Sequence, residues 1–271
     1  MQYPQPGGRL WLIGGTKESA QLALAIAQIT LPCTISVTTE SAKSLYPTVP
    51  ALRVWVGRLT AECLGEFLQQ QQIVAVLDAS HPYAVEISQS AIAAAKERQI
   101  PYLRYERPTV DTELNDWPMI LLDSFDTLLA GDYLRGQRAL LTVGYKPLHL
   151  FEPWHERSTL FARILPSAIA IDAALKAGFT AQRLIALRPP ISAELEKALW
   201  RHWQISLVVT KASGTAGGED IKRIVAAELG VCLVVITRPF VAYPQKTSDL
   251  LSALEFCRHY VFSGSTSRLH F

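Results

Sequence analysis

The sequence has little excess charge and no long apolar run. Of its 271 residues, 18% are charged, and 26 lysines and arginines nearly balance 24 aspartates and glutamates. Proteins that bind nucleic acid non-specifically carry a marked basic excess, so this composition argues against nucleic-acid binding. No apolar run approaches the roughly 18 residues that a membrane-spanning helix needs, so no membrane association is expected.

Cysteine pairs and metal-ligand clusters are also lacking. Cys33, Cys63, Cys232 and Cys257 lie far apart, show no C-x-x-C spacing and mostly fall in apolar patterns. A cysteine in such a pattern acts as a small buried hydrophobe, so we expect reduced, structural thiols. The histidines show no metal-ligand spacing either, and no metal site is predicted.

The amino-terminal segment, residues 1–9, has neither the basic region nor the apolar region of a secretory signal peptide. A cytoplasmic protein is therefore expected. The Walker order of glycines before a lysine is absent as well, because Lys211 precedes the glycines that follow it. ATP or GTP hydrolysis thus loses its main support.

Short apolar runs alternate with longer segments of helical period, which is typical of parallel βα units. The expected strands are 9–13, 34–38, 52–56, 73–78, 102–105, 138–143, 160–164, 183–187, 205–210 and 231–236. The expected helices are 17–28, 60–70, 83–98, 168–178, 192–203, 218–229 and 247–260. The pattern predicts an α/β protein with two Rossmann-like domains, mostly parallel sheets and a ligand cleft between the domains.

The length also favours two domains, since domains usually have about 100–200 residues. Glycines at 131 and 136 indicate a hinge. We therefore place a dinucleotide-binding domain at residues 1–131 and a second domain, which completes the cleft, at residues 132–271.

Two glycine-rich loops follow strands and precede helices. Gly14-Gly15-Thr16 follows the first strand, and Lys211-Ala-Ser213-Gly214-Thr-Ala-Gly217-Gly218 follows a strand of the second half. Glycines let the backbone approach a ligand, and helix N-termini attract anions, so each loop is a candidate anion site. Tight-turn geometry alone would also explain the first loop, and a solvated residue at a strand end is the alternative interpretation of Lys211.

Other polar residues cluster where strands end, which is where ligands bind in open parallel sheets. Asp78, Ser80, His81 and Tyr83 follow the fourth strand. An imidazole at such a position can titrate near neutral pH, but Ser80 or His81 would also serve simply to cap the next helix. In the second half the candidates are Thr142, Gly144, Lys146, Arg163, Arg188 and Arg238. Three arginines on one rim would suit a ligand with several carboxylates.

The second strand ends in Thr38 and Thr39, with Glu40 and Lys43 following. Glu40 comes slightly late for the acidic residue that usually holds a ribose 2′-hydroxyl. Hydroxyl groups beside Lys43 suit a 2′-phosphate better, which favours NADPH over NADH.

An ordered set of motifs spans nearly the whole chain and resembles the precorrin-6A and cobalt-precorrin-6A reductases of cobalamin biosynthesis. The motifs are Gly14-Gly15-Thr16-x-Glu18, Asp78-Ala-Ser-His81-Pro82-Tyr83, Arg107-Pro108, Thr142-x-Gly144-x-Lys146, Thr210-Lys211-x-Ser213-Gly214-x-x-Gly217-Gly218 and Arg238-Pro239. One departure is visible: Arg188-Pro189-Pro190-Ile191-Ser192 replaces the Gly-Pro-Phe-Ser turn of many members.

The resemblance implies that NADPH or NADH reduces one double bond of a tetrapyrrole bearing many carboxylates. On this interpretation the cofactor-binding residues are Gly14, Gly15, Thr16, Glu18, Thr38, Thr39 and Ser80. The substrate-binding residues are Thr142, Gly144, Lys146, Arg188, Lys211, Ser213, Gly214, Gly217, Gly218 and Arg238. Asp78, His81 and Tyr83 are the candidate catalytic proton donors. Neighbouring enzymes of the pathway are possible partners.

Two alternatives are retained. A nucleotide-sugar glycosyltransferase of two α/β domains would also use glycine loops at strand ends. A non-catalytic α/β ligand-binding protein would share the architecture but oxidise no cofactor.

Overall fold

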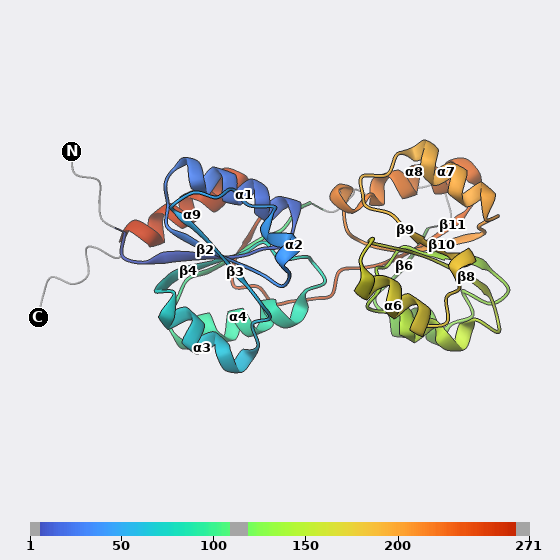
Figure 1. Cartoon of the computed structure of the whole chain (residues 1–271), viewed down its shortest axis with the longest axis horizontal. Helices are drawn as coiled ribbons and strands as arrows, with labels where there is room; N and C mark the ends of the chain where they lie inside the picture. Colours follow the sequence, from blue (N-terminus) through green and yellow to red (C-terminus); the bar gives the residue numbers. More distant parts are fainter. Residues whose placement is uncertain (1–5, 109–118, 264–271) are drawn as a thin grey trace, which may run out of the picture. The chain divides into compact units, whose positions relative to one another are not determined.

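The computed structural model describes residues 6–108 and 119–263, which form two compact units. One unit combines Met1–Pro108 with Phe240–Phe271, and the other is Thr109–Pro239. Each unit is built on its own six-stranded parallel sheet (Figure 1). The expected α/β class with two Rossmann-like domains is thereby confirmed.

The first unit has the strand order β3-β2-β1-β4-β5-β12, in which a sixth strand from the end of the chain completes a dinucleotide-binding type of sheet. Its elements are β1 (Arg9–Ile13), α1 (Lys17–Gln28), β2 (Cys33–Val37), α2 (Glu40–Lys43), β3 (Leu52–Val56), α3 (Ala61–Gln70), β4 (Ile73–Asp78), α4 (Val85–Glu97), β5 (Tyr102–Tyr105), β12 (Lys246–Thr247) and α9 (Leu250–Ser263).

The second unit repeats this order as β9-β8-β7-β10-β11-β6. Its strands and α-helices are β6 (Met119–Leu122), α5 (Phe125–Ala130), β7 (Arg138–Leu141), β8 (Thr159–Ile164), α6 (Ala168–Lys176), β9 (Leu184–Ala186), α7 (Ala193–His202), β10 (Leu207–Lys211), α8 (Glu219–Leu229) and β11 (Cys232–Ile236). Its 3₁₀ helices are η1 (Leu148–Trp154), η2 (Ala181–Arg183) and η3 (Thr215–Gly217).

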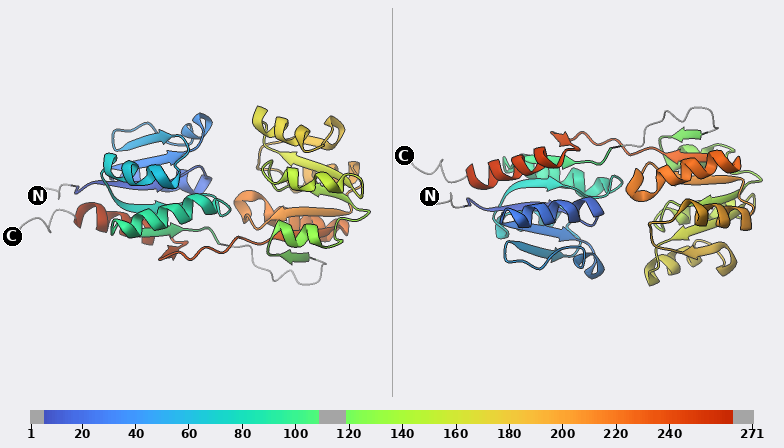
Figure 2. Two further views of the ribbon diagram at one scale, coloured as in Figure 1. Left: turned by 90° about the horizontal axis from the view of Figure 1, so that it is seen from below. Right: turned by 90° about the horizontal axis from the view of Figure 1, so that it is seen from above.

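Helices cover both faces of each sheet, which explains why the central strands are apolar without interruption. In β1, Leu10 and Leu12 pack on the face of α1 and α9, whereas Trp11 and Ile13 pack on the face of α3 and α4. Figure 2 shows α9 beside α1 on one face of the first sheet. These two helical layers hold β1 at the centre of the first unit.

The expected domain boundary after residue 131 is wrong in two respects. β6 and α5 precede that boundary but belong to the second unit, where β6 pairs with β11. β12 and α9 lie near the end of the chain but belong to the first unit, where β12 pairs with β5. The glycines at 131 and 136 therefore lie in a loop inside the second unit, between α5 and β7.

The four cysteines are free thiols, as expected. Burial raises the pKa of Cys257 to about 12, and it also raises the pKa of Cys33. Among the described residues, no helix is long and apolar enough to cross a membrane. Within the same ranges, no group of histidine, cysteine and carboxylate side chains is placed to hold a metal ion.

Candidate functional site

The first unit brings two candidate loops together where its strand order reverses. β1 lies beside β4, and Ile13 at the end of β1 pairs with Asp78 at the end of β4. The Thr16 hydroxyl donates a hydrogen bond of 2.8 Å to the Ala79 carbonyl. The Gly14-Gly15-Thr16 loop and the segment after Asp78 therefore form one edge, at the place where open parallel sheets bind ligands.

The amides of this glycine loop already have acceptors inside the protein. Gly15 N–H donates to the Tyr46 hydroxyl at 2.7 Å, and Thr16 N–H donates to Ser19 Oγ at 3.0 Å. A Cβ on Gly14 would lie 2.3 Å from the Tyr46 hydroxyl, so any larger residue at position 14 would clash with Tyr46. Sequence reasoning missed Tyr46, because it lies in a loop without any motif.

Thr16 caps α1, and Ser19 completes the capping box: Ser19 N–H donates to Thr16 Oγ1 at 3.0 Å. In helix geometry this arrangement leaves the first two N–H groups, those of Lys17 and Glu18, to face an external acceptor. An anion at this edge would therefore meet the first turn of α1 rather than the glycine amides.

Asp78 is completely buried and accepts four hydrogen bonds. Oδ1 accepts from Ser80 N–H and Arg104 Nη1, both at 2.9 Å, and Oδ2 accepts from Ser88 Oγ at 2.6 Å and Tyr102 Oη at 2.5 Å. Burial and the neighbouring Asp78 raise the pKa of Tyr102, which keeps its hydroxyl a donor. With both oxygens occupied, Asp78 holds its neighbours in place and is not exposed to a substrate.

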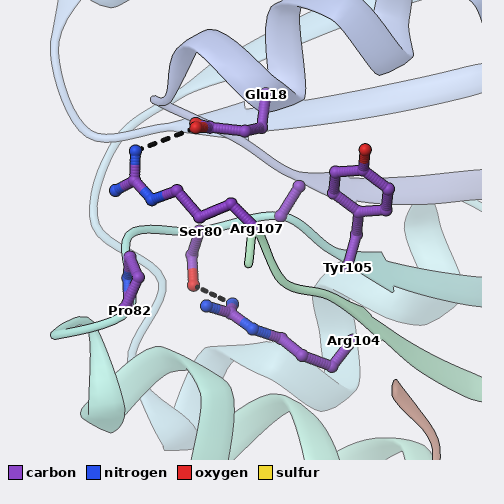
Figure 3. A pocket seen from close by; sticks show the side chains of 7 residues that line it. Glu18, Ser80, Pro82, Arg104, Tyr105 and Arg107 are labelled. Atoms are coloured by element: carbon purple, nitrogen blue, oxygen red, sulfur yellow. Dashed lines mark hydrogen bonds and ion pairs between the residues drawn. The ribbon is translucent and has the colours of Figure 1, made fainter. Parts of the chain in front are cut away.

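A small recess opens above this network (Figure 3). It is lined by Glu18, Ala79, Ser80, Pro82, Arg104, Tyr105 and Arg107. Arg107 Nη1 lies 2.8 Å from Glu18 Oε1, and Arg104 Nη1 donates to Ser80 Oγ at 3.0 Å. The recess thus joins Glu18 and Ser80, which the sequence predicts as cofactor-binding residues, with Arg104, which it missed. Arg104 sits within an apolar strand pattern that gives no sign of a functional group.

His81 and Tyr83 lie on the segment that follows this edge and are more accessible than Asp78. His81 is exposed and Tyr83 half-buried, and Tyr83 N–H donates to His81 Nδ1 at 3.3 Å. Their rings lie 5.7 Å apart between centroids. Of the three candidate proton donors, these two are the ones that a bound molecule can reach.

Thr38 and Thr39 are exposed after β2. The Thr39 hydroxyl accepts from Ala42 N–H at 3.3 Å and so caps α2, the short helix that carries Lys43. Thr38 and the exposed Lys43 are the groups at this strand end that can still meet a phosphate.

The second unit also has polar residues where its central strands end, and two of them are lysines, Lys146 and Lys211. β7 lies beside β10, and Thr142, after β7, donates its hydroxyl to Val209 O at 3.2 Å. Burial, and then the charge of nearby Lys146, lowers the pKa of Lys211 to about 8. Lys211 Nζ also lies 5.8 Å from the centroid of the Phe125 ring. Lys146 and Lys211, both predicted substrate-binding residues, are therefore near enough for their charges to interact.

The glycine loop after β10 is bonded to itself, which the sequence interpretation did not foresee. Gly214 N–H donates to Glu219 Oε2 at 2.8 Å, and Gly217 N–H donates to Gly214 O at 3.0 Å. Gly218 has a positive φ of 68° and donates to Thr215 O at 2.8 Å. The expectation that these glycine amides face a ligand is not met, because internal acceptors hold them.

Ser213 and the buried Lys222 make close contacts with the glycines of this loop. A Cβ on Gly217 would lie 2.0 Å from Ser213 Oγ, so close packing within the loop requires glycine. Lys222 is 2% exposed and donates to the carbonyls of Gly217 and Gly218, each at 3.0 Å. Burial lowers its pKa to about 8. A lysine on a helix has no sequence signal for such a role, and Lys222 was missed.

The three arginines of the predicted rim have different surroundings. Arg163 is bound to buried Glu196 at 2.5 Å, which makes it part of an internal ion pair. Arg238 follows β11 and donates from Nε to Ala212 O at 3.0 Å, beside Lys211 in the chain. Arg188 is exposed after β9, two strands from β7. Gly144 has a φ of 79° and open space on its Cβ side.

Comparison with known proteins gives a match over nearly the whole chain. A family model described as precorrin-6x reductase CbiJ/CobK matches residues 9–258. A cobalt-precorrin-6A reductase from Synechocystis sp. is 45% identical over 252 residues, which are 93% of this chain and 97% of that protein. A cobalt-precorrin-6A reductase from Priestia megaterium is 31% identical over 236 residues, covering 86% of this chain and 91% of its own.

A solved structure supports the same fold. CobK precorrin-6A reductase superimposes with a TM-score of 0.76 at 22% identity, over 93% of this chain and 97% of the other. The sequence match and this fold agree over both units. The chain belongs to the precorrin-6x reductase family, CbiJ/CobK.

Proposed function

We propose that this protein reduces one double bond of the precorrin-6A macrocycle in cobalamin biosynthesis, with a nicotinamide cofactor as hydride donor. The observation that carries the proposal is the family match over residues 9–258, with 45% identity to one named reductase. A match of this length includes both units, so it covers the whole catalytic apparatus and not one shared domain. The reaction class is an oxidoreduction at a CH–CH group.

The cobalt-containing macrocycle is the proposed form of the substrate. The relatives at 45% and 31% identity are both named cobalt-precorrin-6A reductase, whereas a precorrin-6A reductase from Rhodococcus erythropolis is 29% identical over 243 residues. We place the enzyme in the route that inserts the metal before this reduction.

The first unit fits a nicotinamide cofactor. Its strand order is that of dinucleotide-binding sheets. The capped start of α1 and the recess beside Arg104 lie at the edge where such sheets bind their ligands. When bound, the cofactor supplies the hydride. The exposed Thr38 and Lys43 support NADPH over NADH, because together they offer a hydroxyl and a positive charge to a 2′-phosphate.

The second unit fits the carboxylates of the tetrapyrrole. Lys211 ends β10, Lys146 follows the neighbouring strand β7 closely enough to lower the pKa of Lys211, and Arg238 follows β11. Charge-assisted hydrogen bonds from these groups fix the orientation of a flat polyanion. The predicted residues Thr142, Ser213, Gly214, Gly217 and Gly218 support this edge by shaping its loops, and Gly144 and Arg188 extend it.

Reduction of the macrocycle also needs a proton. Tyr83 and His81 are the proposed donors, because both are accessible beside the recess. Asp78 is assigned to positioning, since its two oxygens hold Ser80, Ser88, Tyr102 and Arg104.

No observation favours the glycosyltransferase or the non-catalytic binding protein, because the family that matches is one of reductases. A cytoplasmic location and contacts with neighbouring pathway enzymes stay predictions of the sequence.

Separate fluorescence titrations with NADPH and NADH test the cofactor assignment. We expect NADPH to bind more tightly than NADH and Lys43→Ala to reduce that preference, while Lys96→Ala, a change on the exposed face of α4, leaves it unaltered. Binding of neither nucleotide would rule out the proposed reductase.

A further inference from the structure

Tyr46 is the one buried residue in the connection between β2 and β3. This connection consists of residues 38–51, all of which the structure describes; Tyr46 is 7% exposed, whereas the others are exposed or half-buried. The connection includes α2 and the exposed Thr38 and Lys43, the proposed partners of a 2′-phosphate. A segment that buries so little depends on few contacts for its position.

The Tyr46 hydroxyl connects this segment to the glycine loop after β1. It accepts from Gly15 N–H at 2.7 Å and lies 2.7 Å from Ser19 Oγ. Ser19 Oγ itself donates to the Thr16 carbonyl at 2.7 Å. Because a serine has one hydroxyl proton, Tyr46 is the donor in its hydrogen bond with Ser19. The two hydroxyls therefore link the Gly15 amide to the Thr16 carbonyl in one chain of hydrogen bonds.

Tyr46 and the glycine loop also pack closely. A Cβ on Gly14 would lie 2.3 Å from the Tyr46 hydroxyl and 3.1 Å from Tyr46 Cζ. Burial raises the pKa of Tyr46, so the hydroxyl keeps the proton that it donates. Steric contact thus prevents a closer approach of the loop to Tyr46, and the hydrogen bonds oppose their separation.

The backbone of Tyr46 is bonded to Lys43. Tyr46 N–H donates to the carbonyl of Lys43, the last residue of α2, at 3.2 Å. Tyr46 therefore joins the candidate residue for the 2′-phosphate to the loop that precedes α1. A dinucleotide that meets both places binds more tightly when the protein already holds them in position.

We propose that Tyr46 is a positioning residue for cofactor selectivity. Its side chain holds residues 38–45 against the Gly14-Gly15-Thr16 loop, so that the 2′-phosphate of NADPH meets Lys43 while the diphosphate meets the first turn of α1. This inference rests on the proposed function. Tyr46 acts through Lys43 and not by contact with the cofactor.

The ratio of the dissociation constants of NADH and NADPH tests this role, because a merely structural defect would weaken both nucleotides alike. Calorimetric titration measures both constants in the wild-type protein and in Tyr46→Phe, which removes only the hydroxyl. We expect Tyr46→Phe to reduce the ratio about three- to tenfold, a loss comparable with that of one hydrogen bond. The control Tyr260→Phe, on α9 of the same unit, should leave the ratio unchanged.

A double change shows whether Tyr46 acts through Lys43. Lys43→Ala should reduce the ratio by itself, and adding Tyr46→Phe to it should reduce the ratio no further. Gly14→Ala is a second way to disturb the contact, because its Cβ displaces the Tyr46 ring but leaves the hydroxyl in the protein. It should also lower the ratio. Circular dichroism checks that each variant is folded, and if Tyr46→Phe does not fold, the ratio in Gly14→Ala decides in its place.

An unchanged ratio in folded Tyr46→Phe would overturn the inference, as would additive effects of Tyr46→Phe and Lys43→Ala. Equal binding of NADH and NADPH by the wild-type protein would overturn it as well. In each of these cases a nucleotide still binds, so the proposed function would stand. Failure of both nucleotides to bind the wild-type protein would overturn the proposed function and the inference with it.

Discussion

Asp78 and Arg104 form a buried ion pair beside the recess of the first unit. Each is fully buried, and Asp78 accepts from four donors, which come from α4, from β5 and from the segment that follows β4. Removing one partner of such a pair leaves an uncompensated buried charge, which costs about 3–5 kcal/mol.

Asp78→Leu should therefore lower the free energy of unfolding of the first unit by about that amount. Asp78→Asn keeps an acceptor and should cost less. Urea denaturation monitored by tryptophan fluorescence measures both, and the exposed pair Arg58–Glu86 supplies the control, because Glu86→Leu should change stability by less than about 1 kcal/mol. Equal effects of Asp78→Leu and Glu86→Leu would contradict the assigned role of Asp78.

Lys211, a proposed substrate-binding residue, should make anion binding depend on pH. Its pKa is lowered to about 8 by burial and by Lys146, so the ligand-free protein loses this charge as pH rises through that value. A lysine binds a carboxylate only when protonated, so substrate affinity should fall several-fold above about pH 8, with proton uptake on binding.

Lys146→Ala removes one cause of the lowered pKa and should move the fall in affinity to higher pH, whereas Lys176→Ala, on the exposed face of α6, should not. Calorimetry in two buffers of different ionisation enthalpy measures the proton uptake; an affinity that is flat between about pH 7 and 9 would count against the assignment. Since the folded-state pKa lies below the ordinary value of 10.5, stability gains a contribution from Lys211 as pH rises from about 8 to 10.5.

At the scale of elements, the glycine loop after β10 is a self-bonded unit whose shape depends on Ser213 and Gly217. Gly217→Ala would bring a Cβ to 2.0 Å from Ser213 Oγ, and overpacking of this kind costs typically about 1–3 kcal/mol. Any larger side chain at Gly217 therefore acts on folding before it acts on ligand binding.

Ser213→Gly removes the clashing side chain, so the double change Ser213→Gly with Gly217→Ala should cost less than the sum of the two single changes. Urea unfolding of the four proteins in this cycle gives the coupling energy. Additive costs would mean that the two residues do not meet.

The sequence predicted the regular elements well because apolar periodicity reports burial directly. All ten expected strands have counterparts, and β1 matches residue for residue because it is buried on both faces. The short elements β6, α5 and β12 were missed, since four-residue and two-residue strands are too short to show a period.

Site residues followed the same logic. Thr16 and Ser80 were singled out because they follow apolar strands and Lys211 because it ends one, since strand ends in parallel sheets meet at one edge. Arg104, Tyr46 and Lys222 were missed, because no local sequence pattern records the contacts that give them their roles. Arg104 contacts Asp78, Tyr46 contacts Gly15, and Lys222 contacts Gly217. The glycines after β10 were recognised but misinterpreted, because a sequence does not show that Glu219 and Lys222 fill the loop.

At the scale of the whole molecule, the first unit completes its sheet with a strand that comes after the second unit in the sequence. The chain leaves the first unit after β5, adds β6 beside β11, and returns after residue 239 to add β12 beside β5. The last helix is part of the first core: Ala253, Cys257 and Val261 are 0% exposed.

Deletion of residues 240–271 should therefore unfold the first unit and leave the second folded. Burial of an apolar side chain contributes about 1.5–3 kcal/mol, and losing Cys257, Val261 and their partly buried neighbours removes much of a typical domain stability of 5–15 kcal/mol. Amide hydrogen exchange of the shortened chain reports each unit separately. Protection lost in the second unit instead would contradict the division.

The most direct test of the account follows hydride transfer itself. Two samples of NADPH, each carrying deuterium on one face of nicotinamide C4, are mixed separately with the protein and cobalt-precorrin-6A. The mass of the product is then measured by mass spectrometry. We predict one deuterium per product from one of the two labelled cofactors, with one cofactor oxidised per macrocycle reduced. Cofactor oxidation without deuterium in the product, or no oxidation with a folded protein and both ligands present, would contradict it.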